Sequence, residues 1–249
     1  MKVLVLGGTG EARELAAALH ERDIQVISSL AGRVRDPRLP VGEVRIGGFG
    51  GPARLAEWLA DEGIDAVVDA THPFAERISF SAADAARAAG VPSIMLRRPG
   101  WASRPGWHWV SDLAEAAVRI ESLGKRVFLT TGRQGLAAFA ESPLWFLVRC
   151  VDPPDPPMPA RTHLVLDRGP YSVDGELALM RAHRVDVLVT KDSGGPLTVA
   201  KLDAAERLGL PVVVVRRPDI PDISVVETAS HVLGWLTRAV PPSTPTPDG

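Results

Sequence analysis

The chain has 249 residues, of which 45% are hydrophobic, and its formal net charge at pH 7 is −2. This length suits one large or two modest α/β domains, and the near balance of charge argues against a general polyanion-binding surface. Cys150 is the single cysteine, so an intrachain disulfide and a cysteine-based metal cluster are both excluded. Because cysteine is scarce, the N-terminus lacks a signal-peptide layout and no apolar run could span a bilayer, we expect a cytoplasmic protein.

The first predicted elements are a buried strand, a glycine turn and a helix, which together cover KVLVLGGTGEARELAAAL at residues 2–19. The apolar strand leads directly into the glycines, after which apolar residues recur at helical spacing. Glycines in this position let a phosphate approach the backbone, and the positive end of the helix then faces the anion. The motif G-x-G-x-x-G/A is incomplete because Arg13 occupies its last position, so a tight turn without a cofactor stays open as the alternative. We assign cofactor binding to Gly7, Gly8, Thr9, Gly10 and Glu11.

The segment after the second predicted strand, Ile24–Ser28, bears on the choice between NAD and NADP. An NAD site usually carries an Asp or Glu about twenty residues past the glycine turn, on the ribose hydroxyls. This chain instead offers Ser28 and Ser29, with Arg33 close by. Hydroxyl groups and a guanidinium would bind the extra phosphate of NADP, and one or two such hydrogen bonds would favour NADPH over NADH by roughly a hundredfold. The alternative is that Arg33 is an ordinary loop arginine.

Three further parallel strands complete the first half of the chain, with helices between them. The strands are predicted at Val44–Ile46, Asp65–Asp69 and Ser93–Leu96, and the helices at Pro52–Asp61 and up to about Ala89. Thr71 and His72 follow directly after the second of these strands, at the edge where parallel sheets bind ligands. We therefore include both in the cofactor site, and the alternative for a lone histidine is a structural role.

Pro99–Trp107 (PGWASRPGW) interrupts the alternation of strands and helices and is the expected interdomain linker. Beyond it we predict strands at His108–Val110, Lys125–Thr130, Trp145–Val151, Thr162–Leu166, Asp186–Thr190 and Pro211–Val215, with helices from Asp112, Val173 and Pro196 and at Ala229–Arg238. The halves share a short pseudo-repeat, since Ala89–Pro99 resembles Leu208–Pro218. The predicted fold is α/β, with two Rossmann/flavodoxin-like parallel-sheet domains (residues 1–99 and 100–240), an active site in the cleft between them and a disordered tail at 241–249.

The strand-end loops of the second half are rich in groups that bind anions. Hydroxyls, glycine N–H groups and cations at helix starts suit carboxylates or phosphates, so these loops predict a polyanionic substrate lying opposite a nucleotide. The alternative to a substrate-binding role is that these are ordinary solvated loops with structural salt bridges. The candidate substrate-binding residues are Thr131, Gly132, Arg133, Arg168, Tyr171, Lys191, Ser193, Gly194, Gly195, Thr198 and Lys201.

Several enzyme classes are disfavoured by missing motifs. A short-chain dehydrogenase needs a Tyr with a Lys four positions on, but the single tyrosine, Tyr171, is followed there by Gly175. The chain has neither the G-x-x-x-x-G-K-[ST] phosphate loop of an ATPase nor the G-x-S-x-G elbow of a hydrolase. Its six histidines are scattered without metal-ligand spacing, so we expect no metal site.

Together these motifs resemble the precorrin-6A reductase family of cobalamin (corrin ring) biosynthesis, a family with a branch that acts on the cobalt-bearing substrate. The matching stretches lie in order and span nearly the whole chain apart from the tail. They are Leu6–Ala12, Asp69–Ala75 (DATHPFA), Thr130–Arg133 and Thr190–Gly195, with Thr198 and Lys201 behind them. The DATHPFA stretch is specific, whereas the glycine turn alone is not.

The resemblance implies hydride transfer from NADPH to a carbon of the precorrin-6A macrocycle, giving precorrin-6B. It also implies a substrate with many carboxylates, which accounts for the loops of the second half. Since the cofactor carries the hydride, the protein aligns the reactants, and alignment alone can supply several kcal/mol. If a side chain donates a proton, the first candidate is His72, followed by Lys191 or Asp192.

Three alternatives stay open at this level. One is the same reduction on cobalt-precorrin-6A, and another is an NADPH reductase for a different carboxylated substrate. The third is a non-catalytic NADP-binding module that senses redox state, which would leave the donor-rich loops unexplained. Neither nucleic acid nor membrane is an expected partner, and the expected assembly is a monomer or small homo-oligomer.

Overall fold

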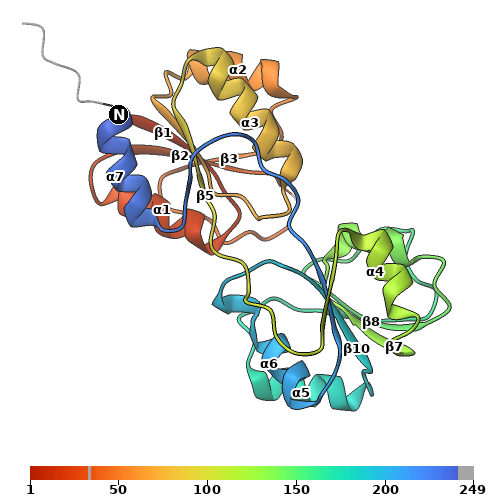
Figure 1. Cartoon of the computed structure of the whole chain (residues 1–249). Helices are drawn as coiled ribbons and strands as arrows, with labels where there is room; N and C mark the ends of the chain where they lie inside the picture. The colour runs from red at the N-terminus through yellow and green to blue at the C-terminus, as the bar shows by residue number, and fades with distance from the viewer. Residues whose placement is uncertain (33–34, 241–249) are drawn as a thin grey trace, which may run out of the picture. The chain divides into compact units, whose positions relative to one another are not determined.

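The computed structural model describes residues 1–32 and 35–240, and its chain divides into two compact units (Figure 1). Unit 1 is Met1–Arg98 with Pro218–Gly249, and unit 2 is Pro99–Arg217. Arg33 and the segment 241–249, which we predicted to be a phosphate contact and a disordered tail, lie outside the described residues. No helix in the described ranges is long and apolar enough to cross a membrane.

Unit 1 is built on a six-stranded sheet in the order β12-β5-β4-β1-β2-β3, with every neighbouring pair parallel. This is the strand order of the dinucleotide-binding fold, and the order reverses between β1 and β4. The elements are β1 (Lys2–Leu6), α1 (Gly10–His20), β2 (Gln25–Leu30), β3 (Glu43–Ile46), α2 (Pro52–Asp61), β4 (Ala66–Asp69), α3 (Glu76–Ala89), β5 (Ser93–Leu96), β12 (Val225–Val226) and α7 (Ala229–Ala239).

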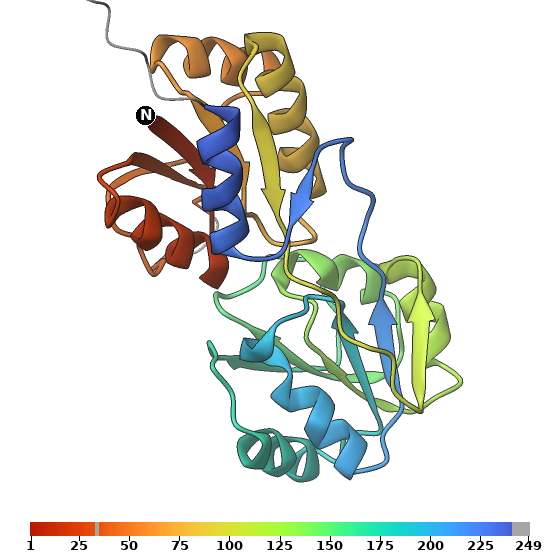
Figure 2. The same cartoon turned by 60° about the vertical axis from the view of Figure 1, so that its left-hand side comes forward.

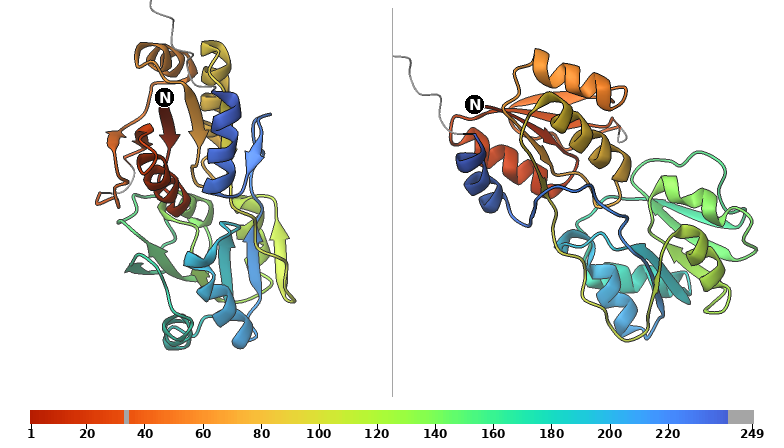
Figure 3. Two further views of the ribbon diagram at one scale, coloured as in Figure 1. Left: turned by 90° about the vertical axis from the view of Figure 1, so that its left-hand side faces the viewer. Right: turned by 45° about the horizontal axis from the view of Figure 1, so that its top comes forward.

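Helices cover both faces of this sheet. Val3 and Val5 pack on the side of α1 and α7, while Leu4 and Leu6 pack on the side of α2 and α3. A strand buried on both faces is apolar throughout, which is why the first strand reads as an uninterrupted apolar run. Figures 1 and 2 show α1 and α7 side by side, and Figure 3 shows α2 beside α3.

The segment 218–240 belongs to unit 1, although we predicted it as part of the second domain. Val225 pairs with Met95 of β5 and so extends the first sheet at its edge. The apolar stripe of α7, including Val232 and Leu236, is buried in the core cluster that contains α1. This placement depends on burial against β5 and α1, which are distant in the sequence. The local pattern of residues 218–240 does not indicate which of the two sheets they pack on.

Unit 2 carries a second parallel six-stranded sheet in the order β6-β11-β10-β7-β8-β9. The elements are β6 (Trp107–Val110), α4 (Leu113–Ile120), β7 (Arg126–Leu129), η1 (Arg133–Phe139), β8 (Trp145–Cys150), β9 (Thr162–Leu166), α5 (Val173–Ala182), β10 (Val187–Lys191), η2 (Pro196–Thr198), α6 (Ala200–Arg207) and β11 (Val212–Val215). Strands β7 to β11 repeat the spatial order of β1 to β5, so the pseudo-repeat falls at equivalent positions, β5 and β11. The two parallel sheets with flanking helices confirm the predicted α/β fold class.

Several predicted strand and helix ends are shifted by one residue, and three places differ by more than that. The second strand runs to Leu30, two residues beyond the prediction. The 3-10 helix η1 after β7 was not predicted, since its one pair of large apolar residues, Leu136 and Phe139, is too short a pattern to mark a helix. The helix predicted from Pro196 begins as the short turn η2 and becomes α-helical at Ala200.

Candidate functional site

The glycine turn after β1 is held by hydrogen bonds to two neighbouring strands. The Gly7 N–H donates to the carbonyl of Ser29 at 2.9 Å. The Thr9 hydroxyl caps α1 by accepting from the Ala12 N–H at 3.1 Å, and it donates to the carbonyl of Ala70 at 2.8 Å. One buried threonine therefore ties the start of α1 to the segment that follows β4, at the point where the strand order reverses.

This turn presents backbone donors in the manner of an anion site. Gly8 has a φ of 108°, which L side chains rarely adopt, and no atom lies within 4 Å of a Cβ built there. The first N–H groups of a helix have no partner within the helix, and its dipole favours an anion. The Glu11 carboxylate lies in the first turn of α1, where it pairs with Arg98 at 2.7 Å. Arg98, which sequence reasoning missed, thus offsets a negative charge that would repel a phosphate.

Both predicted serines lie inside β2 rather than in the loop after it. Ser28 is 1% exposed, and its hydroxyl has no partner among the described residues. Ser29 is also buried, and its carbonyl accepts from the glycine turn. The expectation that both hydroxyls face an adenosine phosphate therefore needs correction, because the strand continues to Leu30 and encloses them.

The end of β4 carries a buried carboxylate. Asp69 is 3% exposed and pairs in register with Leu6, the residue before the glycine turn. Its Oδ1 accepts from the Thr71 backbone N–H at 3.0 Å and from the Thr71 hydroxyl at 2.7 Å. The Thr71 side chain is thus engaged with Asp69, and its hydroxyl oxygen lies 3.5 Å from that of Ser79.

His72 is half-buried immediately beyond this carboxylate. Its Nδ1 accepts a hydrogen bond from the backbone N–H of Phe74 at 3.2 Å. That bond requires a lone pair on Nδ1, so a neutral imidazole carries its proton on Nε2. This geometry leaves His72 a candidate proton donor through Nε2.

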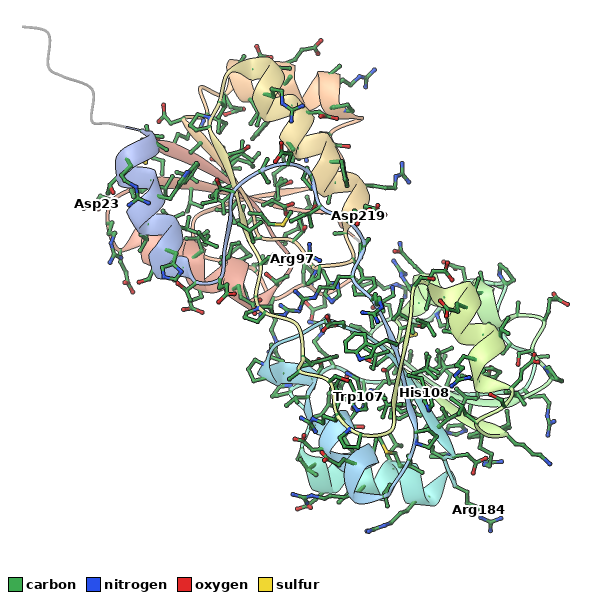
Figure 4. All side chains as sticks on the ribbon, in the orientation of Figure 1. Asp23, Arg97, Trp107, His108, Arg184 and Asp219 are labelled. Carbon is green, nitrogen blue, oxygen red and sulfur yellow. The ribbon has the colours of Figure 1, made fainter. Side chains whose placement is uncertain are left out.

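Asp69, Thr71 and His72 line one pocket of unit 1. Met95 and Arg97, at the end of β5, also line this pocket, as do Asp219 and Ile220 at the start of the segment 218–240, which returns to unit 1 (Figure 4 labels Arg97 and Asp219). The remaining lining residues are Pro73, Glu76 and Ser79. Sequence reasoning had not assigned Asp69, Arg97 or Asp219 to a site. The first two were visible as polar residues at strand ends, whereas Asp219 reaches the pocket through the unpredicted return of the chain.

The loop after β10 anchors the two ends of unit 2. Asp192 is 7% exposed, its Oδ1 accepts from the Trp101 N–H at 3.0 Å, and its Oδ2 pairs with Arg217 Nε at 3.1 Å. A Cβ on Gly194 would collide with the Pro99 carbonyl. The prediction of Asp192 as a catalytic acid is therefore not supported, because both carboxylate oxygens have structural partners within unit 2.

Neighbouring residues of that loop are more accessible. Lys191 ends β10 and is half-buried, and its carbonyl accepts from the Ser193 N–H at 2.7 Å. Gly195 is half-buried, and its carbonyl accepts from the indole of Trp101 at 3.2 Å. Lys191 and Ser193 therefore lie at the strand end with part of each residue open to a ligand.

The loop after β7 occupies the position in unit 2 that the glycine turn occupies in unit 1. Thr131 is buried, and its hydroxyl has no partner among the described residues. Gly132 is exposed with a φ of 78° and precedes η1. Arg133 is half-buried at the first position of η1. Gly132 and Arg133 are thus at least partly accessible at the strand end, while Thr131 is buried.

Lys201, predicted to bind substrate, is buried in unit 2 with other charged groups. Its Nζ donates to the carbonyl of Thr198 at 2.8 Å. Burial, with a smaller contribution from Arg149, lowers its pKa to about 7, and Glu176 opposes that shift. Lys201 is 4% exposed, so it cannot contact a substrate at the surface without moving.

The partners of this buried lysine are themselves paired. Arg149 Nη1 lies 2.6 Å from Glu176 Oε1, and its guanidinium stacks 3.7 Å from the ring centroid of Tyr171. The Tyr171 hydroxyl donates to the carbonyl of Asp167, and burial raises the pKa of this phenol. Arg168, on the same loop, is half-buried. Tyr171 therefore covers an internal ion pair.

A parallel sheet in the dinucleotide-binding order, with an anion-type turn where that order reverses, defines the class of Rossmann-like α/β proteins. The family model for precorrin-6x reductase CbiJ/CobK matches residues 2–237. The chain belongs to this family, which is a family of oxidoreductases.

Individual relatives agree with the family match. A precorrin-6A reductase from Rhodococcus erythropolis is 57% identical over 240 residues, covering 94% of this chain and 97% of the relative. A solved structure titled CobK precorrin-6A reductase is 40% identical, with a TM-score of 0.90 over 96% of this chain and 97% of that one. A cobalt-precorrin-6A reductase from Priestia megaterium is 30% identical, covering 95% of this chain and 98% of the relative.

Proposed function

We propose that this chain reduces precorrin-6A to precorrin-6B with NADPH as the hydride donor, a step of cobalamin biosynthesis. The observation that carries the proposal is the family match over residues 2–237, together with the glycine turn at the reversal point of the first sheet. Membership of a reductase family weighs against a non-catalytic redox sensor. The scarcity of cysteine supports a cytoplasmic location for the reaction.

The residues of unit 1 fit a dinucleotide. The backbone of Gly8, Thr9 and Gly10 would hold the pyrophosphate, with Arg98 neutralising the nearby carboxylate of Glu11. A Cβ on Gly7 would lie 3.3 Å from Leu30 Cδ2, so the turn is already closely packed against β2. When bound, NADPH supplies the hydride. The chain's own residues bind and orient it.

Proton delivery is assigned to His72 in this proposal. Its Nδ1 is occupied by the Phe74 N–H, so the proton at Nε2 is the one that it can donate. Lys191, at the end of β10, is the second candidate. Asp192 is no longer proposed for this role.

The substrate carboxylates are assigned to accessible residues of unit 2, namely Gly132, Arg133, Lys191 and Ser193. Guanidinium, ammonium and hydroxyl groups at strand ends suit several carboxylates at once. The greater identity to the precorrin-6A reductase of Rhodococcus than to the cobalt-precorrin-6A reductase of Priestia, 57% against 30%, supports the metal-free substrate.

The test is the decay of NADPH absorbance when purified protein is mixed with precorrin-6A, with NADH and a protein-free mixture as controls. We expect NADPH consumption with formation of the dihydro product, and little consumption of NADH. Equal rates with both nucleotides would retain the reductase and remove the NADPH preference. Absence of turnover with precorrin-6A, but turnover with cobalt-precorrin-6A, would overturn the choice of the metal-free substrate.

A further inference from the structure

Asp69 combines burial with an unfilled hydrogen-bonding capacity. Its Oδ1 accepts two hydrogen bonds from Thr71, whereas its Oδ2 is buried and has no partner among the described residues. A buried polar atom without a partner is costly, so such an atom in a native structure calls for a specific explanation. Since Asp69 lines the pocket of unit 1, a ligand that brings a hydrogen-bond donor supplies that explanation.

The position of Asp69 in the sheet indicates which part of a dinucleotide it meets. The glycine turn follows β1, and β2 and β4 flank β1 on opposite sides. A dinucleotide centred on the turn therefore extends one half over β2 and the other over β4. In the dinucleotide-binding fold the adenosine half lies on the β2 side, so the nicotinamide half falls on the side of Asp69.

The pocket is small, with room for about one water-sized group, so it would take the amino end of a carboxamide while the aromatic ring lies outside it. Met95, Pro73 and Ile220 provide apolar walls, as ligand pockets commonly do around a few polar groups. Within the nicotinamide ring system, the carboxamide is the group that carries N–H donors, and Asp69 Oδ2 is the acceptor that lacks one. Glu76 and Asp219 also line the pocket, but both are exposed.

We propose that Asp69 recognises the nicotinamide end of the cofactor, with Oδ2 accepting a hydrogen bond from the carboxamide NH₂ while Thr71 holds Oδ1 in place. This inference rests on the proposed NADPH dependence and adds to it a specificity-determining residue. Asp69 lies outside the residues that sequence reasoning assigned to the site. The carboxylate favours nucleotides that retain the amide nitrogen over those that replace it.

Binding of two oxidised nucleotides to the full chain, measured by isothermal titration calorimetry, tests the proposal. NADP⁺ carries the carboxamide, whereas its 3-acetylpyridine analogue has a methyl ketone there and is otherwise the same. We expect wild-type protein to bind NADP⁺ about tenfold or more tightly than the analogue, as a hydrogen bond to a charged group would give. In Asp69→Asn, which keeps the shape and the Oδ1 acceptor, this ratio falls to near one.

The ratio of the affinities for NADP⁺ and for the 3-acetylpyridine analogue separates the effect of the proposed hydrogen bond from that of general electrostatics. Both nucleotides bear the same pyridinium charge and the same ribose hydroxyls. Loss of the Asp69 charge alone therefore weakens the binding of both nucleotides equally and leaves the affinity ratio unchanged. Glu76→Gln is the control, because it removes an exposed carboxylate of the same pocket and leaves the ratio unchanged.

Each outcome has a definite consequence. If wild type binds both nucleotides equally, or if Asp69→Asn retains the preference, the Asp69 proposal is overturned while NADPH dependence stands. If wild type binds neither nucleotide, the proposed cofactor falls, and the Asp69 proposal with it. Should Asp69→Asn fail to fold, as judged by circular dichroism, the wild-type ratio still decides.

Discussion

Replacing the buried Lys201 by Met is predicted to change how the stability of the protein depends on pH. The ammonium lies 5.1 Å from the ring centroid of Trp101 and is fully enclosed, with Arg149 and Glu176 as its charged neighbours. Its pKa falls from the ordinary value of 10.5 to about 7 on folding. The native state therefore favours the neutral amine, and the unfolded state keeps its proton to higher pH.

The sign follows from proton linkage. Between the folded and unfolded pKa values the unfolded chain binds more protons, so the lysine's contribution to stability rises with pH from about 7 to 10.5. At about pH 6 the folded chain must hold a buried charge, whereas at about pH 9 it holds a neutral amine. From these pKa values, wild type gains roughly 3 kcal/mol of unfolding free energy relative to Lys201→Met between those two pH values.

Urea unfolding of both proteins at the two pH values, followed by circular dichroism, measures this difference. Lys125→Met is the matched control, because Lys125 is an exposed lysine of the same unit. The control should track wild type at both pH values. If the difference between wild type and Lys201→Met stays constant within about 0.5 kcal/mol, the buried amine does not deprotonate on folding and the reasoning fails.

Three further changes test the site as the structure describes it. Asp192→Ala should lower the free energy of unfolding by about 3–5 kcal/mol in urea titrations, because it removes the carboxylate that pairs with the largely buried Arg217. A fall in kcat with unchanged stability would instead restore a catalytic role for Asp192. Gly194→Ala should lower the melting temperature much more than Gly209→Ala does. Both glycines have a φ near 65°, but of the two only Gly194 would bring a Cβ against a backbone carbonyl. Equal decreases in melting temperature would contradict this collision. His72→Ala should reduce kcat roughly 10²–10⁴-fold with KM little changed, and unaltered turnover would remove His72 as the proton donor.

Local sequence pattern by itself determines much of unit 1. The apolar run of β1, the glycines after it and the helical stripe of α1 can all be recognised within residues 2–19, since backbone sterics and side-chain periodicity act over short distances. Pro52 at the first position of α2 and Gly90 at the left-handed end of α3 mark their helices in the same way. The DATHPFA stretch carries the family resemblance without any tertiary information.

Only the tertiary structure decided which polar residues face a ligand and which face the protein. Asp192 and Asp69 both stand at or just after the end of a central parallel strand, so no local signal separates them. The fold gives Asp192 two partners, Trp101 and Arg217, from the two ends of unit 2. It leaves Asp69, which lines a pocket of unit 1, with one buried oxygen that has no partner among the described residues. The return of β12 and α7 to the first sheet is equally invisible in sequence. In each case the outcome depends on burial between residues far apart in the chain, which sequence periodicity does not encode.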